Sequence, residues 1–424
     1  MRRVLLLSVV LVACGEVPGL STGSELHSFG VSLDVWSGSE LIVRSAGLSG
    51  LSSVPQVWLD GAPIPTRRLN DTTLAATIPD APGPHSMQLV GTGFDPGSVI
   101  VHLYGYVEHV EGPELSGRTE PGLDPRYVFG SGPASLRRWN VASNKTIDLG
   151  DTVHAVACTR GVGPGPNAGE IVLLNGGCAG RWTVWHTEPL YPMADTAPVM
   201  TENLVAVPAA GRSIVLGSDT VFVSACAGGT CTTEAVPGTE GRDVVRSPRG
   251  DRAALLTRLV GNPGAPGAPV VDVALGKVAY RIATLSEARG AAFSGGGDTL
   301  YVAGRSASAS NTFTLAAVRA ADGAPLTSRA LEFAPCAVAT DPGGAWLYVA
   351  GLTDAGQSRL QVLDRASLDA ITMLHVTSSA VFGHDDRLCH IMPNPTGHLV
   401  YIVDSQAEHD SAARAHLFSF ETPR

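Results

Sequence analysis

A short unit that recurs along the second half of the chain constrains the fold more than any other feature of the sequence. In each copy an apolar run leads to an Asp, Asn or Ser with glycine three residues later, and a second strand-like run follows. Four copies align, over residues 242–257, 289–304, 336–351 and 389–404. With a weaker fifth copy, their turn glycines lie at positions 211, 250, 297, 344 and 397. Steps of about 40 to 50 residues are typical of the four-stranded blades of a β-propeller.

Each unit also has a local physical explanation. In Asp341-Pro-Gly-Gly344 the carboxylate can hydrogen-bond the turn backbone, proline fixes φ, and the last glycine tolerates a positive φ. Runs with helical apolar spacing are hard to find, whereas short Val, Leu, Ala, Thr and Tyr runs are separated throughout by Gly, Pro, Asp and Asn. This pattern predicts an all-β chain. Coiled coils, TPR arrays and TIM barrels all need helices that this region lacks.

The units resemble the YVTN/lactonase-like family of β-propellers, and the resemblance covers residues 126–424. The family motif is matched by Pro342-Gly-Gly-Ala-Trp-Leu-Tyr-Val349 and then by Leu360-Gln-Val-Leu-Asp364. Counting the inner strands, with a partial blade over residues 126–141, predicts seven blades. We expect strands from the two ends of the region to close the ring, because closure removes two open sheet edges. Such blades serve as scaffolds, binders and lactone hydrolases, so the resemblance implies no single activity.

Residues 25–107 resemble the IPT/TIG immunoglobulin-like domain in the order and spacing of their strand-like segments. These segments are Glu40-Leu-Ile-Val-Arg-Ser-Ala-Gly47, Pro55-Gln-Val-Trp-Leu-Asp-Gly61, Thr73-Leu-Ala-Ala-Thr-Ile-Pro79 and Pro82-Gly-Pro-His-Ser-Met-Gln-Leu-Val90. The sequence departs from the family at Arg44-Ser-Ala-Gly47, where a Gly-Thr-Gly/Asn-Phe element is usual. The resemblance implies an N-terminal Ig-like β-sandwich that acts as a spacer or interaction module. Residues 108–125, which contain prolines and glycines, are predicted to be the linker to the propeller.

Residues 1–14 have the features of a lipoprotein signal peptide. Two arginines precede an apolar run that is too short for a membrane-spanning helix, which needs about 20 residues. The run ends at Leu11-Val-Ala-Cys14, which resembles the lipobox of bacterial lipoproteins, whose cysteine thiol takes a diacylglycerol. Residues 15–24 are small and polar and are predicted to form a flexible tether. Gly15 stands where an aspartate would signal inner-membrane retention, so we expect an outer-membrane lipoprotein of the cell envelope.

Six cysteines remain after Cys14, and an even number in an exported chain favours disulfides over metal ligands. The candidate pairs are Cys226 with Cys231, Cys158 with Cys178, and Cys336 with Cys389. The first pair flanks Ala-Gly-Gly-Thr, which can turn a hairpin and bring its ends together. The second pair flanks one loop, and the third occupies equivalent positions in neighbouring units. A bridge needs Cα atoms within about 7 Å, and buried thiols are the alternative for each pair.

The charge and the remaining motifs narrow the classes of function. A formal net charge of −10 without a Lys/Arg cluster argues against nucleic acid and anionic membrane surfaces, so we expect membrane contact through the lipid alone. His384-Asp-Asp-Arg-Leu-Cys-His390 fits either a divalent metal site or a solvated loop that runs into a strand. We favour the loop and predict no metal or cofactor. Four tryptophans fit either a sugar-binding rim or, as we favour, the core: Trp139, Trp182, Trp185 and Trp346.

These observations predict a lipid-anchored envelope protein in which a propeller acts as a non-catalytic binding or scaffold module for a protein or glycan. No catalytic residue is predicted, because no Gly-x-Ser-x-Gly elbow or HExxH motif is present. A lactonase-like hydrolase is the alternative from the enzyme class, since propeller enzymes build their sites from loops of several blades. A structural spacer in a surface assembly is the third possibility.

Overall fold

The structure, a computed structural model, describes a subset of the chain. The described residues are 9–10, 33–44, 53–91, 98–114, 116–121, 127–131, 136–148, 161–164, 170–175, 181–187, 190–195, 206–209, 212–216, 221–227, 230–236, 243–256, 267–309, 312–376, 387–394, 398–406 and 414–423. Regular structure in them consists of β-strands, so the predicted all-β class is confirmed. Within these ranges no helix is long and apolar enough to cross a membrane.

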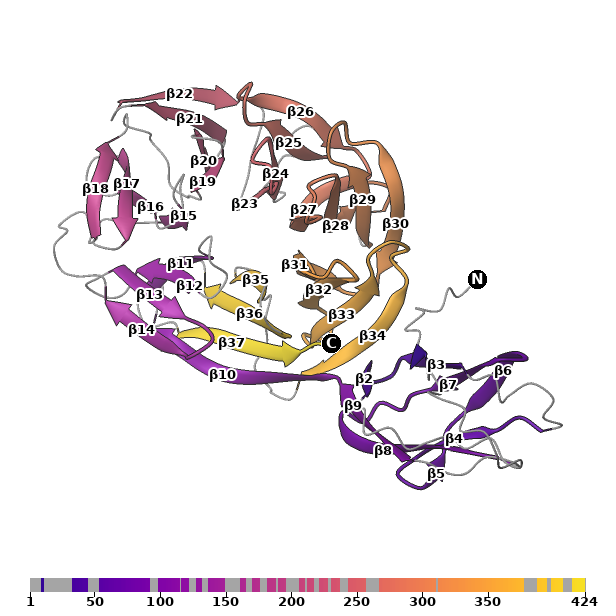
Figure 1. The fold of residues 1–424 in the computed structure, drawn as a ribbon. Coiled ribbons are helices and arrows are strands. Elements are labelled where there is room, and N and C mark those ends of the chain that lie inside the picture. The colour runs from indigo at the N-terminus through magenta and orange to yellow at the C-terminus, as the bar shows by residue number, and fades with distance from the viewer. Residues whose placement is uncertain are drawn as a thin grey trace, which may run out of the picture. The chain divides into compact units, whose positions relative to one another are not determined.

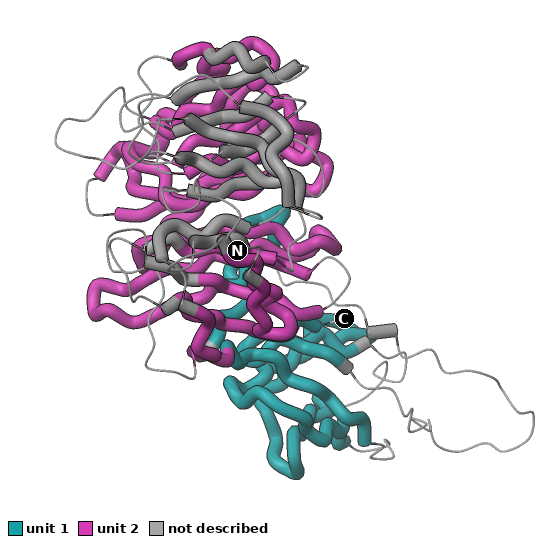
Figure 2. The backbone as a smooth tube through the Cα atoms, turned by 90° about the vertical axis from the view of Figure 1, so that its left-hand side faces the viewer, with its two compact units in different colours: residues 1–107, 361–375, 420–424 teal, residues 108–360, 376–419 magenta. Residues whose placement is uncertain are grey.

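Contacts along the chain define two compact units, which Figure 2 shows in different colours. Unit 1 comprises residues 1–107, 361–375 and 420–424, and unit 2 comprises residues 108–360 and 376–419.

Unit 1 contains two sheets that share one hydrophobic core. Its N-terminal strands are β1 (Val9–Val10), β2 (Leu33–Trp36), β3 (Glu40–Arg44), β4 (Gln56–Leu59), β5 (Ala62–Pro63), β6 (Thr66–Asn70), β7 (Thr73–Thr77), β8 (Gly83–Val90) and β9 (Ser98–Tyr104). One sheet has the order β1-β3-β7-β6 and the other β2-β9-β8-β4-β5. Alternate residues of facing strands, such as Leu41 and Val43 of β3 and Val101 and Leu103 of β9, are buried in one cluster. This alternation is the period of two that places every second side chain on the inner face.

The remaining strands follow one another along the chain from β10 to β37. They are β10 (Tyr106–Glu114), β11 (Ser116–Pro121), β12 (Tyr127–Ser131), β13 (Leu136–Asn140), β14 (Lys145–Asp148), β15 (Gly161–Pro164), β16 (Glu170–Asn175), β17 (Arg181–Thr187), β18 (Leu190–Asp195), β19 (Ala206–Ala209), β20 (Arg212–Leu216), β21 (Val221–Ala227), β22 (Thr230–Val236), β23 (Asp243–Arg246), β24 (Arg252–Leu256), β25 (Ala268–Asp272), β26 (Lys277–Ile282), β27 (Leu285–Phe293), β28 (Thr299–Ser306), β29 (Phe313–Arg319), β30 (Pro325–Leu331), β31 (Ala334–Thr340), β32 (Trp346–Leu352), β33 (Ser358–Asp364), β34 (Ala370–Val376), β35 (Arg387–Pro393), β36 (Leu399–Gln406) and β37 (Arg414–Glu421).

These strands form consecutive antiparallel sheets, most of them four-stranded. The four-stranded sheets are β11–β14, β15–β18, β19–β22, β23–β26 and β27–β30, and an eight-stranded sheet has the order β31-β32-β33-β34-β10-β37-β36-β35. One strand in every four along the chain contacts the next such strand: β11, β15, β19, β23, β27, β31 and β35 follow one another in this way, and β35 contacts β11. The innermost strands of unit 2 therefore close a ring, with the sheets arranged around it (Figure 1).

The ring is completed by strands from opposite ends of unit 2. Closure by pairing between the two ends was predicted within residues 126–424, whereas the N-terminal strand that performs it, β10, precedes that region. β10 pairs antiparallel with β37, with Glu108 opposite Ser419 and Val110 opposite Leu417. Side chains from the first and last sheets then share a core, in which Trp139 packs with Tyr401. The prediction that residues 108–125 are a linker was wrong, because β11 and most of β10 lie within them. These strands were missed because polar residues such as Glu108 and Glu111 lie along β10, and an exposed strand need not show a regular apolar pattern.

The turn that defines the repeat has the predicted geometry wherever the structure describes it. Gly250, Gly297 and Gly344 have φ of +72°, +72° and +77°, and each donates its N–H to the carbonyl of the residue three positions earlier. In the second of these turns Ser294 Oγ accepts the N–H groups of Asp298 and Thr299. Positive φ explains the glycine, and local hydrogen bonding explains the Ser or Asp that begins the turn.

A β-bulge recurs at one position of the repeat and explains a second glycine. In β27 the register with β28 shifts between Ala288 and Gly290, and in β31 the register with β32 shifts between Pro335 and Ala337. The residues added by the bulges are Arg289 and Cys336. A Cβ atom on Gly304 would lie 1.9 Å from the Glu287 carbonyl oxygen, and one on Gly351 would lie 2.1 Å from the Ala334 carbonyl oxygen. Only glycine fits opposite each bulge, because the partner backbone occupies the space of a side chain.

Candidate functional site

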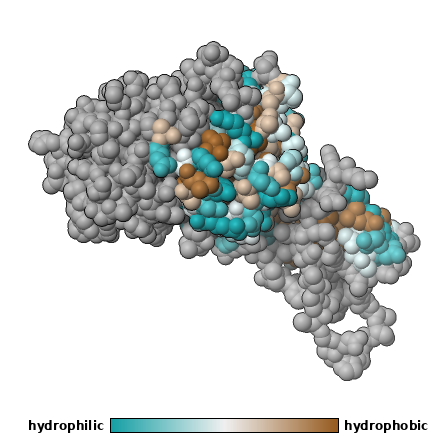
Figure 3. Space-filling model, turned by 90° about the horizontal axis from the view of Figure 1, so that it is seen from above, coloured by the Kyte–Doolittle hydropathy of each residue, from teal (hydrophilic) through white to brown (hydrophobic). Residues whose placement is uncertain are grey.

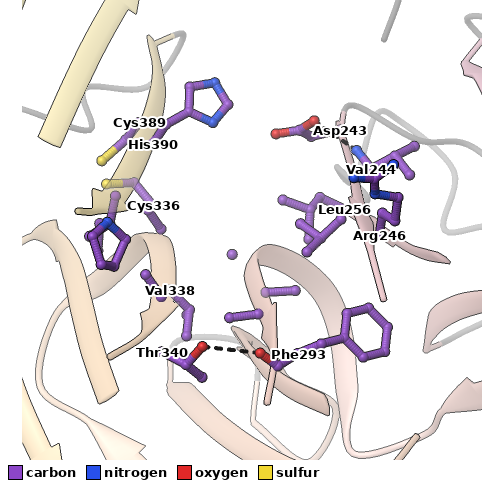
Figure 4. A pocket seen from close by; sticks show the side chains of 18 residues that line it. Asp243, Val244, Arg246, Leu256, Phe293, Cys336, Val338, Thr340, Cys389 and His390 are labelled. Atoms are coloured by element: carbon purple, nitrogen blue, oxygen red, sulfur yellow. Dashed lines mark hydrogen bonds between the residues drawn. The ribbon is translucent and has the colours of Figure 1, made fainter. Parts of the chain in front are cut away.

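The candidate site is a pocket of about 330 Å³ on the innermost strands of unit 2 (Figure 4). Three sheets contribute to its wall, through β23 and β24, through β27, and through β31 and β35 at the two ends of the eight-stranded sheet. The lining residues are Asp243, Val244, Val245, Arg246, Leu256, Gly290, Ala291, Ala292, Phe293, Cys336, Ala337, Val338, Ala339, Thr340, Cys389, His390, Ile391 and Pro393. Most are apolar or small, and the charged and thiol groups come from the innermost strands β23, β31 and β35.

β23 brings the two oppositely charged side chains into the wall. Asp243 begins the strand and is buried, and its Oδ1 accepts a hydrogen bond of 2.7 Å from the Val244 N–H. Arg246 ends the strand, and burial lowers the pKa of its guanidinium below the ordinary value. An arginine titrates so far above neutrality that this shift leaves it charged. The pocket therefore holds a partly desolvated cation at neutral pH.

The opposite wall carries two thiols and a histidine. Cys336 comes from the bulge of β31, while Cys389 and His390 come from β35. In Figure 4 the two sulfur atoms lie at the same end of the pocket and point toward one another. No disulfide joins them in the structure, which differs from the pairing that the sequence suggested.

Close packing of neighbouring inner strands fixes the floor of the pocket. A Cβ atom on Gly290 of β27 would lie 2.9 Å from the backbone of Ala337 in β31, so the two strands approach as closely as glycine allows. The Thr340 hydroxyl donates a 3.1 Å hydrogen bond to the Phe293 carbonyl oxygen and joins the same strands at their other ends (Figure 4). β27 and β31 are thus held together by a close backbone approach and by a hydrogen bond from a side chain.

A cluster of charged side chains on β27 and β28, together with a ring on β29, lies next to the pocket. Its member Arg289 directly precedes Gly290, which lines the pocket. Glu287 is buried and accepts hydrogen bonds from Arg289 Nε at 2.9 Å and from Arg305 Nε at 3.2 Å. Both guanidinium groups also lie over the ring of Phe313, at 5.3 and 5.4 Å from its centroid. The carboxylate and the ring hold the two arginines in place, so the cluster stabilises the bulge that presents Arg289.

Some of the residues predicted from the sequence lie in the described part of the chain and others do not. Three of the predicted cysteines, Cys14, Cys158 and Cys178, lie outside the described residues. Cys226 and Cys231 are directly opposite one another in the β21–β22 hairpin, which is the arrangement expected for that pair. Trp139 and Trp346 are buried, which is the core packing that we favoured over a sugar-binding rim.

The region His384–His390 is described only from Arg387 onward, where β35 begins. Among the described residues, no group of three or more His, Cys, Asp or Glu side chains is arranged to hold a metal ion. The sequence reasoning missed Asp243 and Arg246 as pocket residues. The alignment of the repeat units could have indicated them. Asp243 and Arg246 lie in the first strand of their unit, and the first strands of the other aligned units line the same pocket.

No protein-family model matches the sequence, and no curated protein matches it. Solved structures that are similar include the β-propeller domain of Myceliophteria thermophila Cps50 (Swd1), at 11% identity and a TM-score of 0.48, covering 73% of this chain and 98% of that one. A chain of a mitotic checkpoint complex has 11% identity and a TM-score of 0.54, covering 74% and 90%. Kuenenia stuttgartiensis hydrazine synthase has 14% identity and a TM-score of 0.49, covering 69% and 93%.

At this level of identity the likenesses show the fold alone, and the match with a TM-score of 0.54 carries that argument. Together with the closed ring of inner strands, it defines the class: the chain contains a β-propeller.

Proposed function

We propose that the protein is a lipid-anchored component of the cell envelope whose propeller binds a ligand without transforming it. The observation that carries this proposal is the composition of the pocket on the innermost strands of unit 2. Among the described residues, its lining contains one carboxylate, one guanidinium, one imidazole and two thiols in a mainly apolar wall. Apolar walls with a few placed polar groups are typical of binding sites, and partner recognition is a common use of propellers. A protein or glycan segment, or a small molecule with an apolar body, fits this chemistry.

The finer architecture is part of the same proposal. We infer seven blades: β11–β14, β15–β18, β19–β22, β23–β26, β27–β30, β31–β34, and β35–β36–β37 with β10 as the outer strand. We also infer that the two sheets of unit 1 are an Ig-like sandwich of the IPT/TIG kind and that the blades belong to the YVTN/lactonase-like family. The supporting observations are the sheet order and the motifs in the sequence.

Anchoring through the lipid is supported by Leu11-Val-Ala-Cys14 and by the tether that follows. Replacement of Cys14 by serine should leave the precursor unlipidated and uncut by the lipoprotein peptidase. Labelled palmitate incorporation and membrane fractionation would measure this, and the parent chain in the same cells is the control. Incorporation of palmitate by Cys14→Ser would refute the anchor.

Hydrolysis is less well supported because Asp243 is the single carboxylate among the described residues that line the pocket. An acid–base mechanism at that carboxylate would require Asp243, whose Oδ1 already accepts the Val244 N–H. Dihydrocoumarin is a suitable lactone probe. We expect the parent and Asp243→Asn to leave its uncatalysed rate unchanged. Turnover by the parent that Asp243→Asn abolishes would establish the hydrolase instead.

Binding can be tested with 8-anilinonaphthalene-1-sulfonate, which has an apolar body and an anionic sulfonate that Arg246 can pair with. We expect its fluorescence to rise on addition of the parent protein, and Ala291→Trp, which fills the pocket, to reduce the rise. Leu275→Trp adds the same side chain at an exposed site and is the matched control. Equal fluorescence from both tryptophan variants would place the probe elsewhere and contradict the proposal. On the face shown in Figure 3, hydrophilic and hydrophobic residues of the described part are intermixed.

A further inference from the structure

Two thiols from neighbouring inner strands share one end of the pocket. Cys336 belongs to β31 and Cys389 to β35, and these strands contact one another in the ring. Cys389 is buried and Cys336 is partly buried, and both line the pocket. The sulfur atoms point toward one another in Figure 4. A small ion in the pocket can therefore reach both.

The backbone holds Cys336 in its unusual position. Cys336 is the residue added by the bulge of β31, between the pairs Pro335–Gly351 and Ala337–Ala350. Bulges turn a side chain away from the ordinary alternation of a strand and are common next to functional sites. The glycine across the ladder leaves the bulge no freedom, since a Cβ there would meet the Ala334 carbonyl oxygen. The thiol is therefore directed by a feature of the fold rather than by a mobile loop.

The donor set defines the class of ligand. Thiolates are soft ligands that select Cu(I) over hard cations such as Mg²⁺ and Ca²⁺. A tetrahedral zinc site needs further protein ligands, and the described residues contain no cluster of three or more suitable side chains. Cu(I), unlike zinc, is stable with two thiolates alone. Val338 of β31 and Ile391 of β35, the strands that carry the thiols, also line the pocket and make its wall on that side largely apolar.

We propose that Cys336 and Cys389 bind one soft, thiophilic metal ion, with Cu(I) as the ion that this site fits. Binding replaces the two S–H protons by the metal: Cu(I) and two thiols give a dithiolate complex with one negative charge and two released protons. Arg246 and Asp243 line the opposite wall of the same pocket. The site lies in the pocket for which a ligand-binding function is proposed above, but its test is separate, because it measures metal binding to the two thiols.

The test is an anaerobic titration of the reduced full-length chain with Cu(I) in competition with bicinchoninate. We expect Cys336→Ser and Cys389→Ser each to lose one tightly bound ion that the parent binds. Replacement of an outer-shell partner of a metal ligand weakens binding by about 10- to 100-fold, so loss of a ligand should weaken it by more than about 100-fold. Affinity of the parent should also fall as the pH is lowered, because binding releases protons.

The double variant Cys226→Ser/Cys231→Ser is the matched control, since it removes two cysteines from another sheet and should keep the tight site. Circular dichroism must show that each variant folds, and Cys389→Ala replaces Cys389→Ser if the buried hydroxyl prevents folding. Single variants that bind as many Cu(I) ions as the parent, with the same affinity, would overturn the proposal. Non-reduced peptide mapping that finds Cys336 joined to Cys389 in protein from its native compartment would also overturn it.

Discussion

Replacement of Gly304 by alanine should destabilise the propeller strongly, although it adds one methyl group. The added Cβ would lie 1.9 Å from the Glu287 carbonyl oxygen, 2.9 Å from the Glu287 carbonyl carbon and 3.0 Å from the Ala288 Cα. All three are backbone atoms of β27, so no side-chain rotation can relieve the clash. The strand would have to move away at its bulge, where Glu287 also holds Arg289 and Arg305.

The expected magnitude follows from the size of that displacement. Overpacking a well-packed core costs about 1–3 kcal/mol, and occasionally more. A contact this short against backbone belongs at the upper end, at about 3 kcal/mol or more. For a domain of this size each kcal/mol shifts Tm by about 2 °C, so we expect Tm to fall by roughly 6 °C or more.

Gly295→Ala in the same sheet is the matched control. A Cβ at that position meets nothing within 4 Å, so alanine should change the free energy of unfolding by less than about 1 kcal/mol. Differential scanning calorimetry of the two variants and the parent measures the difference directly. A Gly304→Ala protein that melts within a degree of Gly295→Ala would refute the close backbone approach at the bulge. It would also refute the explanation that the glycine ending Tyr-Val-Ala-Gly in the repeat is required by that approach.

Three further predictions concern other parts of the ring. Mass spectrometry of non-reduced peptides should find Cys226 joined to Cys231, and two alkylated thiols would contradict this. Burial lowers the pKa of His109 below 6.5 in the folded state. The unfolded chain therefore binds a proton first as pH falls, so stability should be full above about pH 7 and decline below about pH 6.5; His109→Gln should flatten that decline. Deletion of residues 385–424 should give aggregated protein, because β37 no longer pairs with β10.

The His109 prediction also has a geometric basis. Its Nε2 lies 3.0 Å from His416 Nδ1 across the β10–β37 pair, and its ring packs against Phe418. One imidazole donates and the other accepts, so protonation of both would remove the hydrogen bond and place two positive charges together. Glu111 acts in the opposite direction, since its charge favours protonated His109. Thermal melts that are independent of pH between 5 and 7 would contradict this coupling.

The sequence predicted the parts of the fold that depend on local turn chemistry. The Asp/Ser-x-x-Gly turns could be identified because a positive φ requires glycine and the turn backbone requires a short polar side chain. Both residue types therefore recur in the sequence at regular intervals. The β10 strand could not, because its stability comes from pairing with β37, more than 300 residues away in the chain, and not from its own apolar pattern. Ring closure was predictable as a physical necessity, but the strand that performs it was not.

The pocket was harder to predict than the fold because its chemistry is distributed. Asp243, Arg246, Cys336 and His390 come from three inner strands and form no local motif. What the sequence did contain was the column of the alignment in which Arg289, Cys336 and Cys389 are equivalent. That column marks the bulge in two units, and a bulge is where a strand can present a side chain outside its usual alternation.

The variation within this column suggests how one scaffold can carry different chemistry around its ring. The glycine opposite the bulge is kept in both described bulged units, at Gly304 and Gly351, because the backbone there leaves no room for a side chain. The bulged residue itself is under no such constraint, so it is Arg289 in one unit and Cys336 in the next. In the first unit the side chain is used within the fold, bound to Glu287. In the second it faces the pocket beside Cys389, which is why the thiol pair, rather than the arginine cluster, is where we expect a ligand.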